Sequence, residues 1–156
     1  MEEDTPAVLS LKREHNYWLK EDPHGFQACP TCNVNGSLNW KVWRCAVPGL
    51  KETPWEGGIY QLLLVFNEQY PNCPPKCVFD PTLFHPNVYP WGTLGVSPQS
   101  EGKPISIEQF LLDIQQLLSS PDINVPSQRV AHELFANDRV EYDKRVRLQA
   151  SERALK

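Results

Sequence analysis

The sequence has no long hydrophobic run. The longest clear one covers residues 62–66, far fewer than the about 20 residues that a helix needs to cross a bilayer. Residues 1–6, MEEDTP, are acidic and lack the apolar stretch of a secretion signal. We therefore expect no membrane partner and an intracellular protein, placed in the nucleus, the cytoplasm or both.

Cysteine is scarce and odd in number, with five residues, which favours free thiols over a disulfide framework. Residues 29–32 read Cys-Pro-Thr-Cys. A thioredoxin-like CxxC should open a helix, whereas this one ends a predicted strand and leads into a turn. A zinc site needs further ligands, and Cys73 and Cys77 offer an irregular spacing. We expect neither a metal site nor a cofactor.

The sequence also lacks an excess of basic residues. Lys and Arg number 15 against 19 for Asp and Glu, which gives a formal net charge of -4. Binding to duplex nucleic acid depends on clustered cations, so nucleic acid is not the expected partner. Neither an HExxH nor a G-x-S-x-G motif is present, which argues against the hydrolases that use them. The length of 156 residues predicts one domain, residues 1–156.

Hydrophobic periodicity and turn residues predict an α+β fold. Residues 8–20 form an amphipathic helix through Val8, Leu11, Trp18 and Leu19. Consecutive strands with short links then favour an antiparallel meander. The predicted strands cover residues 25–29, 38–47, 58–66 and 76–79, with an Asn35-Gly36 hairpin turn between the first two. In the second strand both parities carry apolar residues, which indicates either a bulge or a sheet covered on both faces.

Three helices are predicted after the sheet. A capping box at residues 106–109 begins a central helix that ends before Ser120-Pro121. A second helix covers residues 127–135, where Val130, Ala131, Leu134 and Phe135 supply the apolar positions. The last covers residues 140–156 and is rich in Arg, interspersed with acidic residues that are typical of a solvated face.

A proline-bounded segment, residues 84–97, carries apolar side chains with His85 and Asn87 between them. Prolines and glycines exclude a long regular element there, so it should be a loop held against the core. Its sequence His-Pro-Asn-Val-Tyr-Pro-Trp-Gly-Thr resembles the active-site segment of ubiquitin-conjugating enzymes, in particular the SUMO-conjugating members. Further matching motifs are TPWEGG at residues 53–58, YP at 70–71, PPKC at 74–77 and VEYDKRV at 140–146.

One departure from that resemblance concerns the catalytic nucleophile. In the family a cysteine follows Gly-Thr and one further residue, and it carries the modifier as a thioester. Here that position is Gly95. Glycine has no side chain to acylate, and covalent catalysis requires an activated nucleophile. As written, the chain is not expected to form the thioester.

The resemblance also assigns roles to neighbouring residues. Asn87 matches the asparagine that stabilises the oxyanion, but with Gly95 present we favour a structural role, in which its side chain ties the loop to backbone groups. His85 matches a loop-packing histidine. Tyr89 is retained beside the acceptor lysine, whereas Val125 replaces an acidic or small polar residue and accepts no hydrogen bond. Residues 98–104 resemble a shortened form of the loop beside the active site.

Partner binding is predicted from the same comparison. In SUMO-conjugating enzymes the first helix is basic and binds the modifier and its activating enzyme. Here Lys12 and Arg13 are offset by acidic neighbours, and His15 stands at a usually basic position, so attraction to an acidic partner should be weaker. Around the acceptor groove Trp91 replaces a usually small residue and Val78 a usually basic one. The remaining candidate contacts are Pro74, Lys76 and Pro126.

Three functions are compatible with these observations. The first is a natural non-catalytic variant that binds proteins of a modifier pathway, such as the modifier, its activating enzyme, a ligase or another conjugating enzyme. The second is an active SUMO-conjugating enzyme whose cysteine was replaced by Gly95 in the laboratory. The third is an enzyme with another nucleophile, such as a nearby serine. A single replacement would leave the rest of the site intact, so the accompanying changes at Trp91, Val78 and Val125 favour the first.

Overall fold

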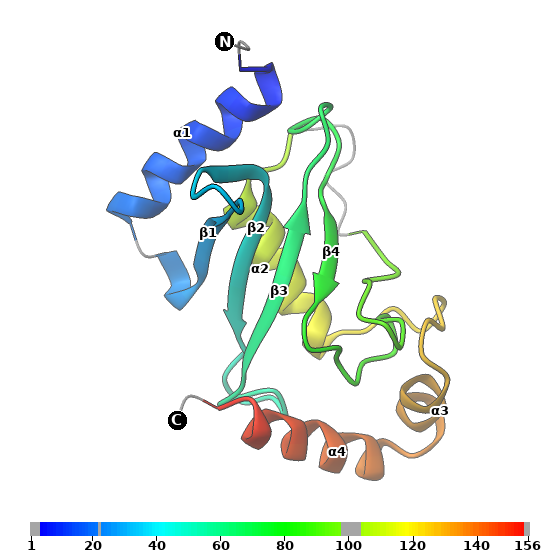
Figure 1. Cartoon of the computed structure of the whole chain (residues 1–156). Coiled ribbons are helices and arrows are strands. Elements are labelled where there is room, and N and C mark those ends of the chain that lie inside the picture. The colour runs from blue at the N-terminus through cyan, green and yellow to red at the C-terminus, as the bar shows by residue number, and fades with distance from the viewer. Residues whose placement is uncertain (1–3, 22, 98–103, 155–156) are drawn as a thin grey trace.

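A computed structural model describes residues 4–21, 23–97 and 104–154. Four strands form one antiparallel sheet in the order β1-β2-β3-β4, so the predicted meander is confirmed (Figure 1). The strands are β1 (Gln27–Cys32), β2 (Leu38–Pro48), β3 (Ile59–Val65) and β4 (Lys76–Phe79). The α-helices are α1 (Pro6–Lys20), α2 (Ile107–Ser119), α3 (Arg129–Asn137) and α4 (Arg139–Glu152), and a short 3₁₀ helix covers Pro23–Gly25.

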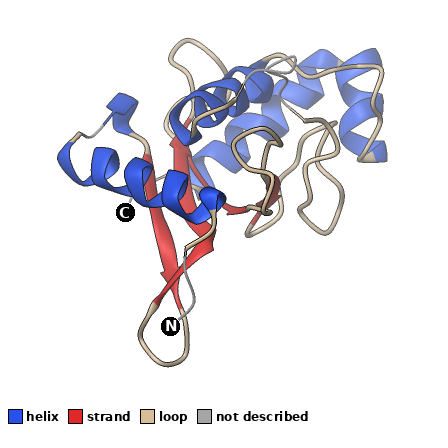
Figure 2. Ribbon diagram, turned by 90° about the horizontal axis from the view of Figure 1, so that it is seen from above, coloured by secondary structure: helices blue, strands red, loops and turns tan. Residues whose placement is uncertain are grey.

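The helices are arranged around the sheet as the α+β prediction required. α2 lies behind the sheet, α1 packs against β1 and β2 at one end, and α4 runs past the other end (Figure 1). Seen from above, α1 crosses the strands (Figure 2). The apolar face of α2 is buried at Phe110, Leu111, Ile114 and Leu118, and it shares one core with the inward-facing residues of β2 and β3.

A bulge explains why both parities of β2 are apolar. Pro30 pairs with Trp43, but the next residue, Thr31, pairs with Asn39, so three residues of β2 have no counterpart on β1. Beyond the bulge Trp43, Cys45 and Val47 point into the core. The predicted end of the first strand at residue 29 is therefore wrong, because pairing resumes after Pro30 and continues to Cys32.

Other sequence predictions need small corrections. Leu19 was placed on the buried face of the first helix but is 70% exposed, and Val130 was placed on that of its helix but is 51% exposed. The central helix is capped by Ser106, whose hydroxyl accepts from Gln109 N at 3.1 Å. The Gln109 side chain does not complete the capping box, since it donates to Asp113 instead. The last helix stops at Glu152, and the Arg153 carbonyl accepts from Ile59 N at 2.9 Å.

A half-buried carboxylate joins α1 to α2. Glu14 accepts a hydrogen bond from Ile107 N at 2.7 Å and another from the Tyr70 hydroxyl. Burial raises the pKa of this carboxyl, although both hydrogen bonds oppose the shift. The first helix is thereby positioned by its charged face as well as by its apolar one.

We expect Glu14→Ala to lower the free energy of unfolding by about 2–4 kcal/mol, since it leaves the Ile107 N–H and the Tyr70 hydroxyl without their partner. Glu14→Gln retains an acceptor for Ile107 and should lose less than half of that. Urea denaturation measures both. Glu21→Ala, at an exposed position, is the control and should stay within about 0.5 kcal/mol of the wild type. Equal losses for Glu14→Ala and Glu21→Ala would contradict the role of Glu14.

Candidate active site

The segment of residues 84–97 is held along the free edge of β4. Phe79 N donates to Gly92 O at 2.8 Å, and Leu94 N donates to Cys77 O at 2.9 Å. Gly92 has a φ of +106°, and a Cβ there would lie 2.4 Å from the Phe79 carbonyl oxygen. Only glycine fits this close approach. The loop is therefore fixed to the sheet by backbone geometry.

His85 is an internal packing residue of this loop. It has no exposed surface, and its ring lies 5.6 Å from that of Trp55. Its Nε2 is 3.0 Å from the carbonyl oxygen of Leu117, and its Nδ1 accepts from Asn87 N at 3.0 Å. Burial lowers the pKa of His85 to about 4. With both ring nitrogens engaged, the neutral imidazole has no lone pair free to act as a base.

The Asn87 side chain ties the loop to the segment that follows α2. Its Nδ2 donates to Asp122 O at 2.8 Å and to Val125 O at 2.9 Å. Its Oδ1 accepts from Asp122 N at 2.8 Å. The residue is fully buried. A primary amide has two N–H donors, and both are used here, so in this arrangement neither is free for an oxyanion.

Gly95 lies next to these residues and is half-buried. Its N–H donates to Asn87 O at 2.7 Å. Tyr89 is close on one side, since a Cβ built on Gly95 would lie 3.0 Å from Tyr89 Cε2. Val125 is connected to the site through its carbonyl, which accepts from Asn87, and not through its apolar side chain. The structure thus connects Gly95 to Asn87 and Tyr89 directly and to Val125 through Asn87, while the buried His85 accepts from Asn87 N.

A shallow cavity of about 210 Å³ opens beside Gly95. It is lined by Pro75, Lys76, Cys77, Leu94, Gly95, Val96, Ser97 and Phe110. Cys77 is 3% exposed, and burial raises the pKa of its thiol. The nucleophile in cysteine chemistry is the thiolate. The Cys77 thiol is therefore poorly suited to replace the catalytic thiol that position 95 lacks.

The predicted partner-binding residues fall into separate areas. Lys12, Arg13 and His15 belong to α1, at the opposite end of the sheet from α4 (Figure 1). Lys12 is paired with Asp4 at 2.6 Å. His15 packs against the rings of Trp40 and Trp43 at 5.3 and 5.9 Å, so its ring is part of the helix-to-sheet contact.

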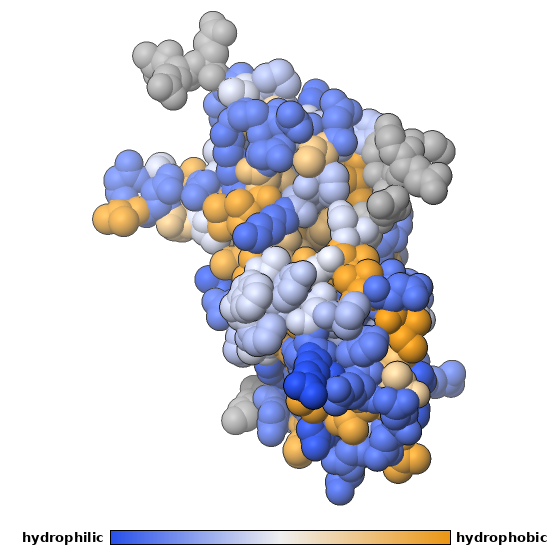
Figure 3. All heavy atoms as spheres, turned by 90° about the vertical axis from the view of Figure 1, so that its right-hand side faces the viewer, coloured by the Kyte–Doolittle hydropathy of each residue, from blue (hydrophilic) through white to orange (hydrophobic). Residues whose placement is uncertain are grey.

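The other candidates surround the loop. Trp91 is 70% exposed and stacks on Tyr89 with ring centroids 4.8 Å apart. Lys76 and Pro126 are exposed, whereas Pro74 and Val78 are half-buried. Figure 3 faces this side of the molecule and shows hydrophobic and hydrophilic residues interleaved over it. The predicted loop of residues 98–104 lies almost entirely outside the described residues.

Sequence reasoning missed three residues that complete the site. Ser127 lies against Gly95. Gln128 donates from Nε2 to the carbonyls of Leu83 at 2.8 Å and Val88 at 2.9 Å. Asp122 supplies the backbone partners of Asn87. Each contacts residues about 30 to 45 positions away, and the local pattern carries no signal for such contacts.

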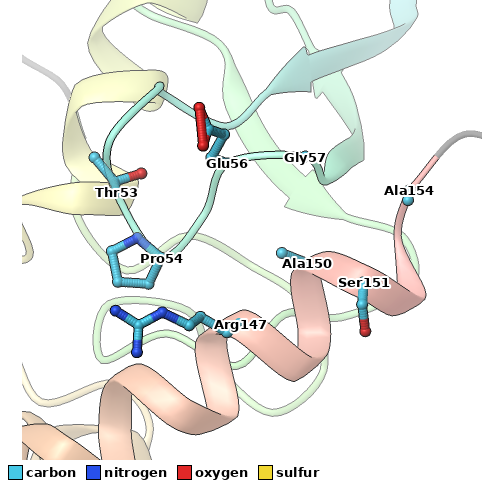
Figure 4. Close-up of a pocket in the computed structure, with 8 residues that line it drawn as sticks. All are labelled: Thr53, Pro54, Glu56, Gly57, Arg147, Ala150, Ser151 and Ala154. Carbon is cyan, nitrogen blue, oxygen red and sulfur yellow. The ribbon is translucent and has the colours of Figure 1, made fainter.

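A larger cavity, of about 300 Å³, lies between the 53–57 loop and α4. Its polar side chains do not converge: the Glu56 carboxylate points away from the Arg147 guanidinium, and the Ser151 hydroxyl points away from the cavity (Figure 4). That hydroxyl donates to Leu148 O at 2.7 Å. We assign no site there.

Among residues 4–21, 23–97 and 104–154, no group of His, Cys, Asp or Glu side chains could hold a metal ion. Within the same part of the chain, each helix is too short or too polar to span a bilayer.

Comparison with known proteins agrees with this fold and loop. The family model described as ubiquitin-conjugating enzyme matches residues 10–150. The chain therefore belongs to the ubiquitin-conjugating enzyme family.

Within that family the chain is similar to SUMO-conjugating enzymes. It is 46% identical over 148 residues to SUMO-conjugating enzyme UBC9 of Caenorhabditis elegans, a match that covers 92% of this chain and 89% of that protein. It is 44% identical to Sumo-conjugating enzyme ubc9 of Dictyostelium discoideum, with 90% and 91% covered. It is also 44% identical to SUMO-conjugating enzyme SCE1 of Arabidopsis thaliana, with 91% of each chain covered.

Proposed function

We propose that this chain is a SUMO-conjugating-enzyme-like protein that carries no modifier itself and acts as a non-catalytic binding or regulatory protein in a ubiquitin-like modifier pathway. The observation that carries the proposal is Gly95, which offers only hydrogen where the resemblance places the cysteine. Its protein partners would be the modifier, the activating enzyme, a ligase or another conjugating enzyme, and its location the nucleus or the cytoplasm.

The described buried groups that lie against Gly95 support the proposal because none of them is an activated nucleophile. Cys77 is buried with a raised pKa. Ser127 is 8% exposed, and the His85 ring nitrogens are engaged elsewhere, so that histidine cannot activate a serine. The two amide hydrogens of Asn87 are also bound to protein carbonyls. An enzyme that uses Ser127 as its nucleophile is therefore disfavoured.

A charging assay tests the proposal directly. The purified chain is incubated with SUMO-activating enzyme, SUMO and ATP, and adducts are separated without reducing agent. We expect at least a roughly hundredfold lower yield of reductant-sensitive adduct than with the Caenorhabditis elegans enzyme as the positive control, because acyl transfer needs a nucleophile. A thioester on the unaltered chain would refute the non-catalytic function.

Binding is measured separately by calorimetry with SUMO and with the activating enzyme, and ubiquitin serves as the control ligand. Binding of either pathway protein without ubiquitin binding is expected for a pathway-specific binding protein. A chain that binds neither would contradict the modifier and the activating enzyme as its partners.

The alternative is an active SUMO-conjugating enzyme whose cysteine was replaced by Gly95, which the identity to the three relatives also favours. The two differ in the source gene: a glycine at codon 95 of the genomic sequence supports the natural variant, and a cysteine codon supports the replacement.

A further inference from the structure

The side chain of Ser127 lies where a side chain on Gly95 would have to begin. A Cβ built on Gly95 would be 2.2 Å from Ser127 Oγ and 3.2 Å from Ser127 Cβ. Both distances are shorter than ordinary van der Waals contact between heavy atoms. Tyr89 Cε2, at 3.0 Å, limits the space on another side. Gly95 is therefore enclosed by neighbouring side chains.

The backbone at Gly95 does not itself demand glycine. Gly25, Gly36, Gly57 and Gly92 have left-handed φ values between +71° and +106°, and Gly95 is not among the residues with positive φ. A residue with a side chain could adopt this backbone without strain. The obstacle to a side chain at this position is steric and comes from Ser127 and Tyr89.

No hydrogen bond explains the position of the Ser127 hydroxyl. The residue is 8% exposed, and its Oγ has no hydrogen-bond partner among the residues that the structure describes. Its backbone N–H is satisfied by Pro86 O at 2.9 Å. A buried hydroxyl without a partner is unfavourable compared with a methyl group, so what the oxygen provides here is volume beside a residue without a side chain.

We propose that Ser127 closes the acyl-accepting position, so that this site is blocked by packing in addition to lacking a thiol. A side chain at position 95 requires Ser127 to shift, so Ser127 hinders a nucleophile placed there. The inference rests on the proposed function, and it predicts that a cysteine at position 95 regains modifier transfer faster when Ser127 is also reduced in size.

Charging provides the first test. Gly95→Cys and Gly95→Cys/Ser127→Ala are each incubated with SUMO-activating enzyme, SUMO and ATP. In the reaction the thiolate at position 95 attacks the thioester carbonyl on the activating enzyme, a new sulfur–carbon bond forms, and the activating enzyme's cysteine leaves as its thiolate. We expect the double variant to charge at least about tenfold faster, because a small displacement of the nucleophile lowers such rates strongly. Equal rates would overturn the proposal.

Thermal unfolding provides a test that needs no chemistry. Gly95→Ala should lower Tm by about 3–8 °C, since its Cβ would be forced against Ser127 and Tyr89 and overpacking is destabilising, and Gly95→Ala/Ser127→Ala should recover at least half of that loss. Ser127→Ala alone should leave Tm unchanged or slightly higher, because no hydrogen bond is lost. In contrast Ser106→Ala, which removes a helix cap, should lower Tm by about 2–4 °C.

Every combination of results from the charging and thermal tests either supports or overturns the steric role of Ser127. If neither cysteine variant charges, the thermal series decides: a Gly95→Ala variant as stable as the wild type would overturn the steric role of Ser127. Charging of the unaltered chain, in contrast, would refute the non-catalytic function without bearing on the contact between Ser127 and position 95.

Discussion

Asn87→Ala is expected to lower the free energy of unfolding by about 3–5 kcal/mol. The substitution removes three hydrogen bonds, two from Nδ2 to the carbonyls of Asp122 and Val125 and one from Asp122 N to Oδ1. Leaving a buried backbone group without a partner costs about 1–3 kcal/mol. Because water can partly hydrate the half-exposed 122–125 segment, the expected loss is smaller than the sum of these costs over the three broken hydrogen bonds. Urea denaturation measures the loss.

Asn124→Ala is the matched control, since this neighbouring asparagine is exposed and should change stability by less than about 0.5 kcal/mol. Asn87→Asp separates the donor from the acceptor role: it keeps an acceptor for Asp122 N but loses both donors, so it should be nearly as damaging as alanine. If Asn87→Ala unfolds at the wild-type urea concentration, the side chain does not hold the loop, and a role in binding or in assisting an acyl transfer becomes the better explanation.

The second large effect is a loss of stability in acid that depends on His85. Its pKa is lowered by burial to about 4, whereas an unfolded histidine titrates near 6.5. Between these values the unfolded chain binds the additional proton, so stability falls as the pH decreases through that window. From pH 7.5 to pH 5.0 this single group should remove about 2 kcal/mol.

Glu14 opposes this trend, because its raised pKa makes the folded state bind protons more readily than the unfolded state in mildly acidic solution. The contribution of His85 is therefore obtained by difference. The stability gap between wild type and His85→Gln should shrink by about 2 kcal/mol from pH 7.5 to pH 5.0, because only the wild type carries the buried imidazole. A constant gap for His85→Gln would mean that the buried ring titrates as a free one does.

Sequence patterns predicted the helix ends and turns well where contacts between near neighbours along the chain form them. Ser106 caps α2 through a contact three residues along the chain, and Gly36 supplies the positive φ of the first hairpin. Errors arose where pairing between strands decided the outcome, as at Pro30, because a bulge on one strand depends on the register of its neighbour.

The sequence by itself determined the family motifs, the meander and the absence of a thiol at position 95, since each is a property of residue identity or short-range spacing. Only the tertiary structure decided that both donors of Asn87 are already used, that His85 is sealed under the loop, and that Ser127 fills the space beside Gly95. These three features depend on contacts between segments about 30 to 40 residues apart in the sequence. Tertiary packing sets the distances in such contacts, and the residue pattern of either segment alone does not predict them.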